Sequence, residues 1–256
     1  MTTHLPLPLK VATWNLNGLR ARAAQLLEWM AAEQPDVLCL QEIRVTHAQI
    51  PMDMIEMEGF HSLWHGGPKG YSGVALHISN RLGEPTFHHP EFDFENRIVG
   101  AHIGNWVFYS VYVPNGGKDL AAKMNFLEAL EKHLAGLAAE GRQVVLCGDL
   151  NLTGSDKDVH PRERKPNAVG QLPLERELFH RIQALGYVDI QRQLHPQDEE
   201  IFTWWAPWRN LRQRNIGWRI DYILANTELA QYARTCVSQR EFGTSDHAPL
   251  VAQFGA

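Results

Sequence analysis

The chain has 256 residues and a formal net charge of −5, with 24 Lys and Arg against 29 Asp and Glu. It contains no run of about 18 apolar residues, and residues 1–10 lack the basic flank and long apolar stretch of a signal peptide. We therefore expect a cytoplasmic protein with no membrane partner. The negative total argues mildly against nucleic acid, unless positive charge is concentrated locally.

Apolar, β-rich runs outnumber helical patterns along the chain. The expected strands cover residues 9–14, 36–40, 73–78, 98–103, 107–113, 143–147, 220–224, 235–237 and 250–254. The expected helices cover residues 21–33, 120–139 and 174–185. Gly104 and Asn105 separate two neighbouring runs, which predicts a β-hairpin and at least partly antiparallel pairing. The mixture favours an α/β fold with two packed mixed β-sheets flanked by helices over a doubly wound parallel sheet.

The even spread of these elements favours one domain over residues 1–256, with residues 1–9 as a short leader. The longest irregular stretches are residues 152–171 and 206–217. Loops of that length in a compact domain are usually functional.

The cysteines and most histidines show no metal-ligand spacing. Cys39, Cys147 and Cys236 each lie in an apolar run, which predicts reduced, structural thiols. The neighbouring pair His88 and His89 lacks ligand spacing with acids, so we expect surface or loop histidines there.

Short polar motifs follow apolar runs at several places in the chain. They are Asn15-Leu16-Asn17-Gly18, Gln41-Glu42, Tyr112-Val113-Pro114-Asn115, Asp149-Leu150-Asn151, Arg219-Ile220-Asp221-Tyr222 and Ser245-Asp246-His247. A buried strand with such an end delivers polar groups to one rim of a sheet. One motif alone would be an ordinary strand-end cap, but together they indicate an active site. Their oxygen-rich side chains suit Mg²⁺ or Mn²⁺ and a phosphate better than zinc, so metal-assisted phosphodiester cleavage is the leading hypothesis.

Positive charge is concentrated in the two long irregular stretches. Between Trp208 and Arg219 the chain has Arg209, Arg212 and Arg214 but no acid, with Trp218 beside the last arginine. The stretch 157–165 carries a second basic cluster. Each stretch alone suits an ordinary solvated loop. Trp beside Arg favours a nucleic-acid contact, because that pairing suits both base stacking and phosphate binding.

The motifs closely resemble those of the exonuclease III family of AP endonucleases. The matching segments are Trp14-Asn15-Leu16-Asn17-Gly18-Leu19-Arg20-Ala21, Leu40-Gln41-Glu42, Tyr112-Val113-Pro114-Asn115, Gly148-Asp149-Leu150-Asn151, Gly217-Trp218-Arg219-Ile220-Asp221-Tyr222 and Ser245-Asp246-His247-Ala248-Pro249. They span nearly the whole chain in the family's order. The resemblance implies a four-layer α/β sandwich and a Mg²⁺-dependent hydrolase that cuts double-stranded DNA 5′ to abasic nucleotides. It also implies 3′-to-5′ exonuclease and 3′-end-cleaning activities, in proportions that vary between members.

The resemblance also implies roles for individual residues. Glu42 is expected to be the principal metal ligand, with Asn17 and Asp246 close by. Asp149 is expected to orient or deprotonate the attacking water, held by Asn15 and Asn151. His247, paired with Asp221, is expected to face the scissile phosphate, whose oxygens Tyr112 and Asn115 hold. Carboxamide donors stabilise an ionised Asp149, which favours it as the base, although the sequence leaves His247 open as the alternative.

Family positions also suggest DNA contacts. Trp204, Trp218 and Ile220 are expected to wall a pocket for a flipped-out abasic sugar, which an intact nucleotide cannot enter. Trp208 and Lys118 are expected to wedge into the DNA, and Arg209, Arg212 and Asn167 to contact it. Trp205 fits core packing equally well. Two departures from the family pattern, Gly154 and Val169, stand in loops expected to border the site and to alter the balance of activities.

Two other functions fit part of this pattern. A phosphoesterase acting on lipid or inositol phosphates would share Glu42, Asp149 and His247 but would not need the Arg and Trp loop. A catalytically silent, nucleic-acid-binding regulator would be free to lose metal and base residues, and none is missing here. We expect a monomer that acts on duplex DNA with abasic sites or with blocked or recessed 3′ ends.

Overall fold

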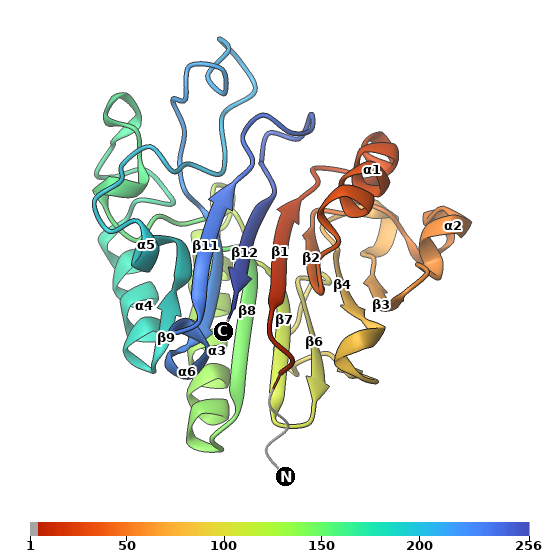
Figure 1. The fold of residues 1–256 in the computed structure, drawn as a ribbon. Coiled ribbons are helices and arrows are strands. Elements are labelled where there is room, and N and C mark those ends of the chain that lie inside the picture. Colours follow the sequence, from red (N-terminus) through yellow and green to blue (C-terminus); the bar gives the residue numbers. More distant parts are fainter. Residues whose placement is uncertain (1–4, 256) are drawn as a thin grey trace.

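The computed structural model describes residues 5–255, apart from the side chain of Asp53, and shows two β-sheets packed face to face with helices on their outer sides (Figure 1). The first sheet has the order β11-β12-β1-β2-β4-β3. Its strands are β1 (Leu9–Asn15), β2 (Val37–Gln41), β3 (Phe60–His65), β4 (Val74–Ser79), β11 (Ala233–Ser238) and β12 (Leu250–Phe254). The second sheet has the order β5-β6-β7-β8-β10-β9. Its strands are β5 (Thr86–His88), β6 (Ile98–Ile103), β7 (Trp106–Tyr112), β8 (Gln143–Asp149), β9 (Tyr187–Asp189) and β10 (Asp221–Asn226).

Each sheet is mixed and has a parallel pair at its centre. β1 and β2 are parallel, with Asn15 opposite Gln41, and β7 and β8 are parallel, with Tyr112 opposite Asp149. The other ladders are antiparallel, including the predicted hairpin of β6 and β7. Because parallel strands end at the same edge, each central pair carries its terminal polar residues to one rim.

Helices surround the sandwich, on the outer faces of its sheets and at its edge. They are α1 (Ala23–Glu33), α2 (Met52–Ile55), α3 (Leu120–Ala139), α4 (Pro173–Ala184), α5 (Ile190–Leu194) and α6 (Thr227–Ala230). Single turns of 3-10 helix occur at Leu19–Ala21, His47–Gln49, Pro68–Gly70, Asn80–Leu82, Asp156–Asp158 and Pro161–Glu163. The spacing of Leu26, Trp29 and Met30 buries one face of α1 against the first sheet, while α3 and α4 pack on the second.

The main core lies between the two sheets and includes all three cysteines, which are free and buried as predicted. With helices outside each sheet, this arrangement confirms the predicted four-layer sandwich. Among the described residues, no helix has the length and apolar character needed to cross a membrane.

The structure adds elements that the sequence patterns do not indicate. These include three edge strands, β3, β5 and β9. Their sequences lack the strong hydrophobic alternation from which a strand is predicted. The predicted leader is also not wholly separate from the fold. Leu9 begins β1 and is 1% exposed, and Leu5 and Leu7 pack against the core between the sheets. Residues 1–4 of that leader lie outside the described part.

Candidate active site

The polar ends of the central strands meet at one rim, as predicted. Asn15 ends β1 and Asp149 ends β8, and the Asn15 Nδ2 donates to Asp149 Oδ2 at 2.9 Å across the gap between the sheets. The same amide group donates to Glu42 Oε1 at 2.9 Å. Asn15 therefore connects a carboxylate of the first sheet to a carboxylate of the second.

Asp149 is fully buried yet well supplied with donors. The backbone N–H of Asn151 donates to its Oδ1 at 2.8 Å, and the Asn151 Nδ2 lies 3.3 Å from its Oδ2. Burial, together with the nearby carboxylates of Asp221 and Glu42, raises the pKa of Asp149 to about 7, although His247 and the Asn15 amide oppose that rise. The carboxyl group is therefore able to exchange a proton near neutral pH.

His247 is buried beside two carboxylates. Its Nδ1 lies 2.9 Å from Asp221 Oδ2, and its Nε2 lies 3.9 Å from Asp149 Oδ2, which is too long for a direct hydrogen bond. Burial alone would lower the pKa of the imidazole, but Asp221, Asp149 and Asp246 outweigh it and raise that pKa to about 10. His247 is therefore an imidazolium at neutral pH, held in one orientation by Asp221.

Glu42 lies directly after β2, with its side chain 13% exposed. Besides the Asn15 amide, it contacts the guanidinium of Arg44, and its carboxylate lies near the Tyr112 hydroxyl. One ligand atom each of Glu42, Asp149 and His247 lie within 4.8 Å of one another. Each carboxylate oxygen has more than one lone pair, so this oxygen-rich group fits a hard divalent cation even with its present hydrogen bonds.

Asn17 and Asp246, the other expected metal ligands, contact each other. The Asn17 Nδ2 donates to Asp246 Oδ1 at 2.8 Å, and the Trp204 Nε1 donates to Asp246 Oδ2 at 3.0 Å. Burial would raise the pKa of Asp246, but His247 and these two donors lower it overall. Asp246 is thus an ionised carboxylate. It lies next to Glu42, Asp149 and His247 but is not one of the three described residues whose ligand atoms lie within 4.8 Å of one another.

The turns that follow the central strands have unusual backbone conformations. Asn17, Glu42 and Asn151 have φ of 47°, 47° and 52°, in the left-handed region that L-residues other than Asn, Asp and Gly rarely adopt. Ser245 supports the first of these turns, because its hydroxyl donates to the Asn15 carbonyl oxygen at 2.8 Å. These turns direct the side chains of Asn17, Glu42 and Asn151 out of the sheets and into the rim.

Tyr112 and Asn115 lie beside the two carboxylates. The Arg97 guanidinium stacks 4.7 Å from the centre of the Tyr112 ring. Burial and the nearby carboxylates of Glu42 and Asp149 raise the pKa of the Tyr112 hydroxyl well above its usual value, so it stays protonated. Asn115 is exposed, and its amide donates to Asn151 Oδ1 at 3.2 Å.

A buried lysine under this side of the site escapes the sequence prediction. Lys123, from α3, donates to the Asn151 carbonyl oxygen at 2.6 Å and lies 3.4 Å from that of Asn115. It forms an ion pair with Glu175 of α4, and both side chains are fully buried. A lysine on the apolar face of a predicted helix is the signal that could have identified it.

Trp204 and Trp218 stand next to His247. Their rings meet edge to face, with centroids 5.6 Å apart, and isolated β-bridges pair Trp204 with both Trp218 and His247. Ile220 lies between Arg219 and Asp221 in the chain and is 5% exposed. The structure therefore brings the three predicted wall residues near the site, whereas Trp205, at 1% exposed, belongs to a small core cluster.

The loop 206–217 rises above this rim (Figure 1). Trp208 is 60% exposed, and Arg209 beside it is exposed too. Arg212 differs, because its guanidinium donates to the backbone carbonyls of Arg240, Phe242 and Ser245. Arg212 thus holds the loop to the segment before His247, and its contact with DNA stays a prediction. Lys118 and Asn167, in other loops, are exposed.

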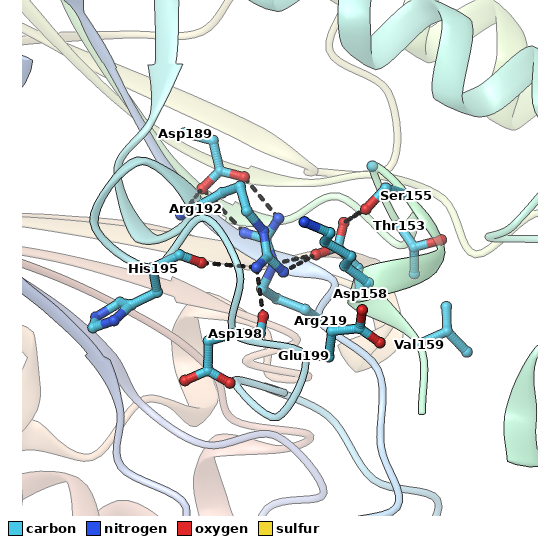
Figure 2. Close-up of polar contacts among 12 residues, drawn as sticks. Thr153, Ser155, Asp158, Val159, Asp189, Arg192, His195, Asp198, Glu199 and Arg219 are labelled. Carbon is cyan, nitrogen blue, oxygen red and sulfur yellow. Dashed lines mark hydrogen bonds and ion pairs between the residues drawn. The ribbon is translucent and has the colours of Figure 1, made fainter. Parts of the chain in front are cut away.

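Arg219 is not part of an exposed basic surface, which corrects its assignment to a phosphate-binding patch. It is 1% exposed, and its guanidinium lies 2.7 Å from a carboxylate oxygen of Asp158 and of Asp189 (Figure 2). Arg192 shares the Asp158 carboxylate at 2.7 Å. This ion network attaches the loop after β8 to Arg219, two residues before Asp221. Other cations of the second basic stretch are also paired, Lys157 with Gln197 and Arg164 with Glu199.

Buried carboxylates next to an imidazolium, below a loop of exposed Arg and Trp, suit a hydrolase of phosphate esters, because cations and donors surround a place where negative charge can develop. Comparison with known proteins agrees with this class. Residues 12–247 match the Endonuclease/Exonuclease/phosphatase family, so the chain belongs to that family, and within it to the exonuclease III and AP endonuclease branch.

Individual relatives cover nearly all of the chain. It is 33% identical to the DNA repair nuclease APEX1 of Danio rerio, over 94% of this chain and 81% of that protein. It is 31% identical to Recombination repair protein 1 of Drosophila melanogaster, of whose length it spans 37%. Among solved structures, an AP endonuclease from Archaeoglobus fulgidus is 32% identical with a TM-score of 0.87, covering 97% of this chain and 100% of that one. A 3′-5′ exonuclease from Neisseria meningitidis is 29% identical with a TM-score of 0.88 and the same coverage.

Proposed function

We propose that this chain is a Mg²⁺-dependent DNA-repair phosphodiesterase that cuts duplex DNA 5′ to abasic sites and removes nucleotides or blocking groups from 3′ ends. The observation that carries the proposal is the buried pair of Asp149 and His247, 3.9 Å apart, at the rim that Glu42 shares. Relatives named as a DNA repair nuclease, an AP endonuclease and a 3′-5′ exonuclease support DNA as the substrate.

The proposed metal site is centred on Glu42, with Asn17 and Asp246 next to it. Its oxygen donors favour Mg²⁺ or Mn²⁺. When bound, the ion supplies positive charge to the phosphate oxygens as negative charge develops on them. Asp246 lies close enough to add to the negative field that attracts the cation, and its hydrogen bond from Asn17 holds both side chains in place.

The proposed proton transfers divide between Asp149 and His247. Asp149 is the group whose pKa lies near neutrality, so we assign it the role of general base toward the attacking water. Asn15 and Asn151 hold its carboxylate in position. His247 is protonated at that pH, which favours a role in stabilising the phosphate oxygens over that of the base. Tyr112, protonated, and Asn115, exposed, are proposed as further donors to those oxygens.

DNA recognition is assigned to the aromatic and basic residues around the rim. Trp204, Trp218 and Ile220 are proposed to form the apolar wall of a pocket that admits an abasic sugar and excludes an intact nucleotide. Exposed Trp208 and Lys118 are proposed to wedge into the DNA. Arg209, Arg212 and Asn167 are proposed to contact its backbone, Arg212 through the loop that it stabilises.

The balance between the two activities depends on how wide this pocket is. The Val169 Cγ1 lies 3.1 Å from the position of a Cβ on Gly116, next to Asn115, and a Cβ on Gly170 would meet the Trp218 ring at 2.9 Å. Val169 therefore belongs to a segment that packs directly against the proposed wall. A Cβ on Gly154 would instead meet the Phe179 side chain at 2.9 Å, so this glycine is explained by packing beneath the loop.

We further propose that residues 1–256 form one catalytic domain that works as a monomer in the cytoplasm. The core shared by both sheets supports a single unit. Three free, buried thiols are consistent with a reducing compartment.

The decisive experiment compares two substrates in Mg²⁺, with EDTA as the blank. One duplex carries a single tetrahydrofuran abasic analogue, and the other is intact with a recessed 3′ end. Faster incision at the analogue would establish the abasic-site activity as the main one, and faster loss from the recessed end would establish the exonuclease. A Val169→Gly variant should shift the ratio toward incision. Hydrolysis of inositol or lipid phosphates without action on either duplex would overturn the proposal.

A further inference from the structure

A second group of possible metal ligands lies away from the active-site group. The described residues contain two sets of three His, Cys, Asp or Glu whose ligand atoms all lie within 4.8 Å of one another, and the second set is His65, His89 and Asp93. Its members come from two segments, and His89 is an exposed loop residue, as expected. Sequence spacing alone does not bring these residues together.

The three residues bridge the outer edges of the two sheets. His65 is the last residue of β3, the edge strand of the first sheet. His89 and Asp93 follow β5, the edge strand of the second sheet. An ion held by all three would therefore cross-link the two sheets at an edge where no strand of either sheet continues the ladder.

Backbone contacts orient Asp93 toward this common point. Its Oδ1 accepts hydrogen bonds from the N–H groups of Arg97 at 2.8 Å and Ile98 at 3.1 Å. That fixes the carboxylate and leaves Oδ2, which lies 2.6 Å from the Nε2 of His65. Metal-binding carboxylates are typically oriented by hydrogen bonds of this kind, in which one oxygen is fixed by the backbone and the other stays directed at the metal site.

The two imidazoles face each other beside that oxygen. The rings of His65 and His89 have centroids 4.0 Å apart at an angle of 26°. One ring nitrogen of His89 lies within 4.8 Å of the ligand atoms of His65 and Asp93. The Asn96 amide lies 3.2 Å from the Nδ1 and 3.3 Å from the Nε2 of His65, so it packs against the edge of that ring.

We propose that His65, His89 and Asp93 bind a late first-row transition-metal ion, with Zn²⁺ as the reference ion, at a site separate from the Mg²⁺ site. Two imidazoles and one carboxylate suit Zn²⁺ better than Mg²⁺, which favours oxygen ligands throughout. His89 is exposed, so solvent reaches the group and a water can complete the coordination.

Occupation of this site would stabilise the segment that positions Tyr112. The Asp93 carboxylate holds the backbone of Arg97, and the Arg97 guanidinium stacks on the Tyr112 ring. The main expected effect of metal binding is therefore a higher melting temperature of the protein, because the ion binds only the folded state. Any change in nuclease rate would follow from the fixed position of Arg97.

Calorimetric titration with Zn²⁺ in excess Mg²⁺ tests the proposal. The matched control is His180→Gln, which replaces a remote, exposed histidine. The wild type and this control should each bind one more Zn²⁺ per chain than His89→Gln or Asp93→Asn does. Zn²⁺ should raise the melting temperature of the first two proteins by several degrees more than that of the last two. Equal stoichiometry, affinity and melting shift in all four proteins would overturn the proposal.

Cobalt provides a readout that does not depend on protein stability. Co²⁺ added to the wild type in excess Mg²⁺ should give visible absorption bands of a low-coordinate nitrogen and oxygen site. His89→Gln is the best comparison because an exposed side chain can be replaced with little risk to folding. Loss of the bands in this variant supports the site, and bands of unchanged intensity contradict it.

Discussion

Asp149 and Asp221 are directly opposite residues in the antiparallel ladder of β8 and β10, and the imidazole of His247 contacts the carboxylates of both. Like charges at facing positions of a ladder repel each other, and both of these side chains are buried. The imidazolium of His247 compensates for that repulsion. The residues proposed for the chemistry therefore also set the charge balance between these two strands.

Replacing Asp149 with Asn should separate catalysis from stability. We expect the rate of incision to fall by several orders of magnitude while DNA binding is retained, because the base is lost but the shape is kept. Stability should not fall, since one of two facing carboxylates is removed. Single-turnover kinetics and binding titrations on the same abasic duplex measure the two effects. Equal losses of rate and binding would contradict the assignment of Asp149 as base.

Comparison of the wild type with Asp149→Asn in EDTA should reveal how the ionisation of Asp149 affects the free energy of unfolding. The pKa of Asp149 is raised from 3.8 to about 7 on folding, so the folded state holds its proton more tightly than the unfolded chain. This group contributes stability below pH 4 that is lost as the pH rises through about 7. The free energy of unfolding of the wild type should therefore decline relative to Asp149→Asn between about pH 4 and pH 7. Urea denaturation at several pH values measures this difference. If the free energies of unfolding of the two proteins change with pH in the same way, the raised pKa of Asp149 is ruled out.

Replacing His247 with Gln should destabilise the protein, in contrast to Asp149→Asn. It leaves two buried carboxylates without their cation, and breaking a buried ion pair in this way typically costs about 3–5 kcal/mol. Urea denaturation at neutral pH in EDTA measures the loss. His180→Gln, which changes an exposed histidine of α4, is the control and should stay within about 0.5 kcal/mol of wild type. A stable His247→Gln would show that the carboxylates are not both ionised.

Two arginines from the same stretch should behave in opposite ways. Arg219→Ala should lower the free energy of unfolding by about 3–5 kcal/mol, because it leaves Asp189 buried without its ion-pair partner and Asp158 with Arg192 alone. Its effect on incision should follow from displacement of Asp221, two residues further along the chain. Chemical denaturation combined with kinetics on the folded fraction measures both, and a variant as stable as the wild type would contradict the role of the network.

Arg209→Ala should leave stability within about 0.5 kcal/mol of wild type, because the side chain is exposed. It should weaken DNA binding and reduce the slope of log K against log salt concentration by about 1, as expected for one lost phosphate contact. Binding measured over a range of salt concentrations tests this. An unchanged slope would remove Arg209 from the DNA-contacting surface.

The sequence patterns predict the central strands and their polar ends well, because a buried strand has a strong apolar run and a polar rim gives it an abrupt end. They do not reveal the edge strands β3, β5 and β9, whose stability comes from pairing with a neighbour rather than from their own pattern. They also mistake Arg219 for a surface cation. Its acidic partners, Asp158 and Asp189, lie far away in the chain, and no local signal connects them.

Lys123 and Glu175 illustrate the same limit on the side of the site. Each is a charged residue in an amphipathic helix, where solvent exposure is the usual outcome. The place of Lys123 on the apolar face of its helix indicates burial, but only the packing of α3 against α4 shows that it pairs with Glu175 beneath Asn151. The expected residue roles at the rim came from motif resemblance, while the ion pairs that hold those residues in position became visible only in the folded chain.

The left-handed turns at Asn17, Glu42 and Asn151 have a consequence for how this protein can change. A glycine at position 42 would adopt the observed φ of 47° more easily than glutamate does, yet it would remove the carboxylate proposed to hold the metal. A library selected for heat resistance alone would therefore tend to enrich inactive chains at this position. Thermal stability and catalysis place opposite demands on residue 42, so substitutions meant to increase thermal stability should be made elsewhere in the molecule.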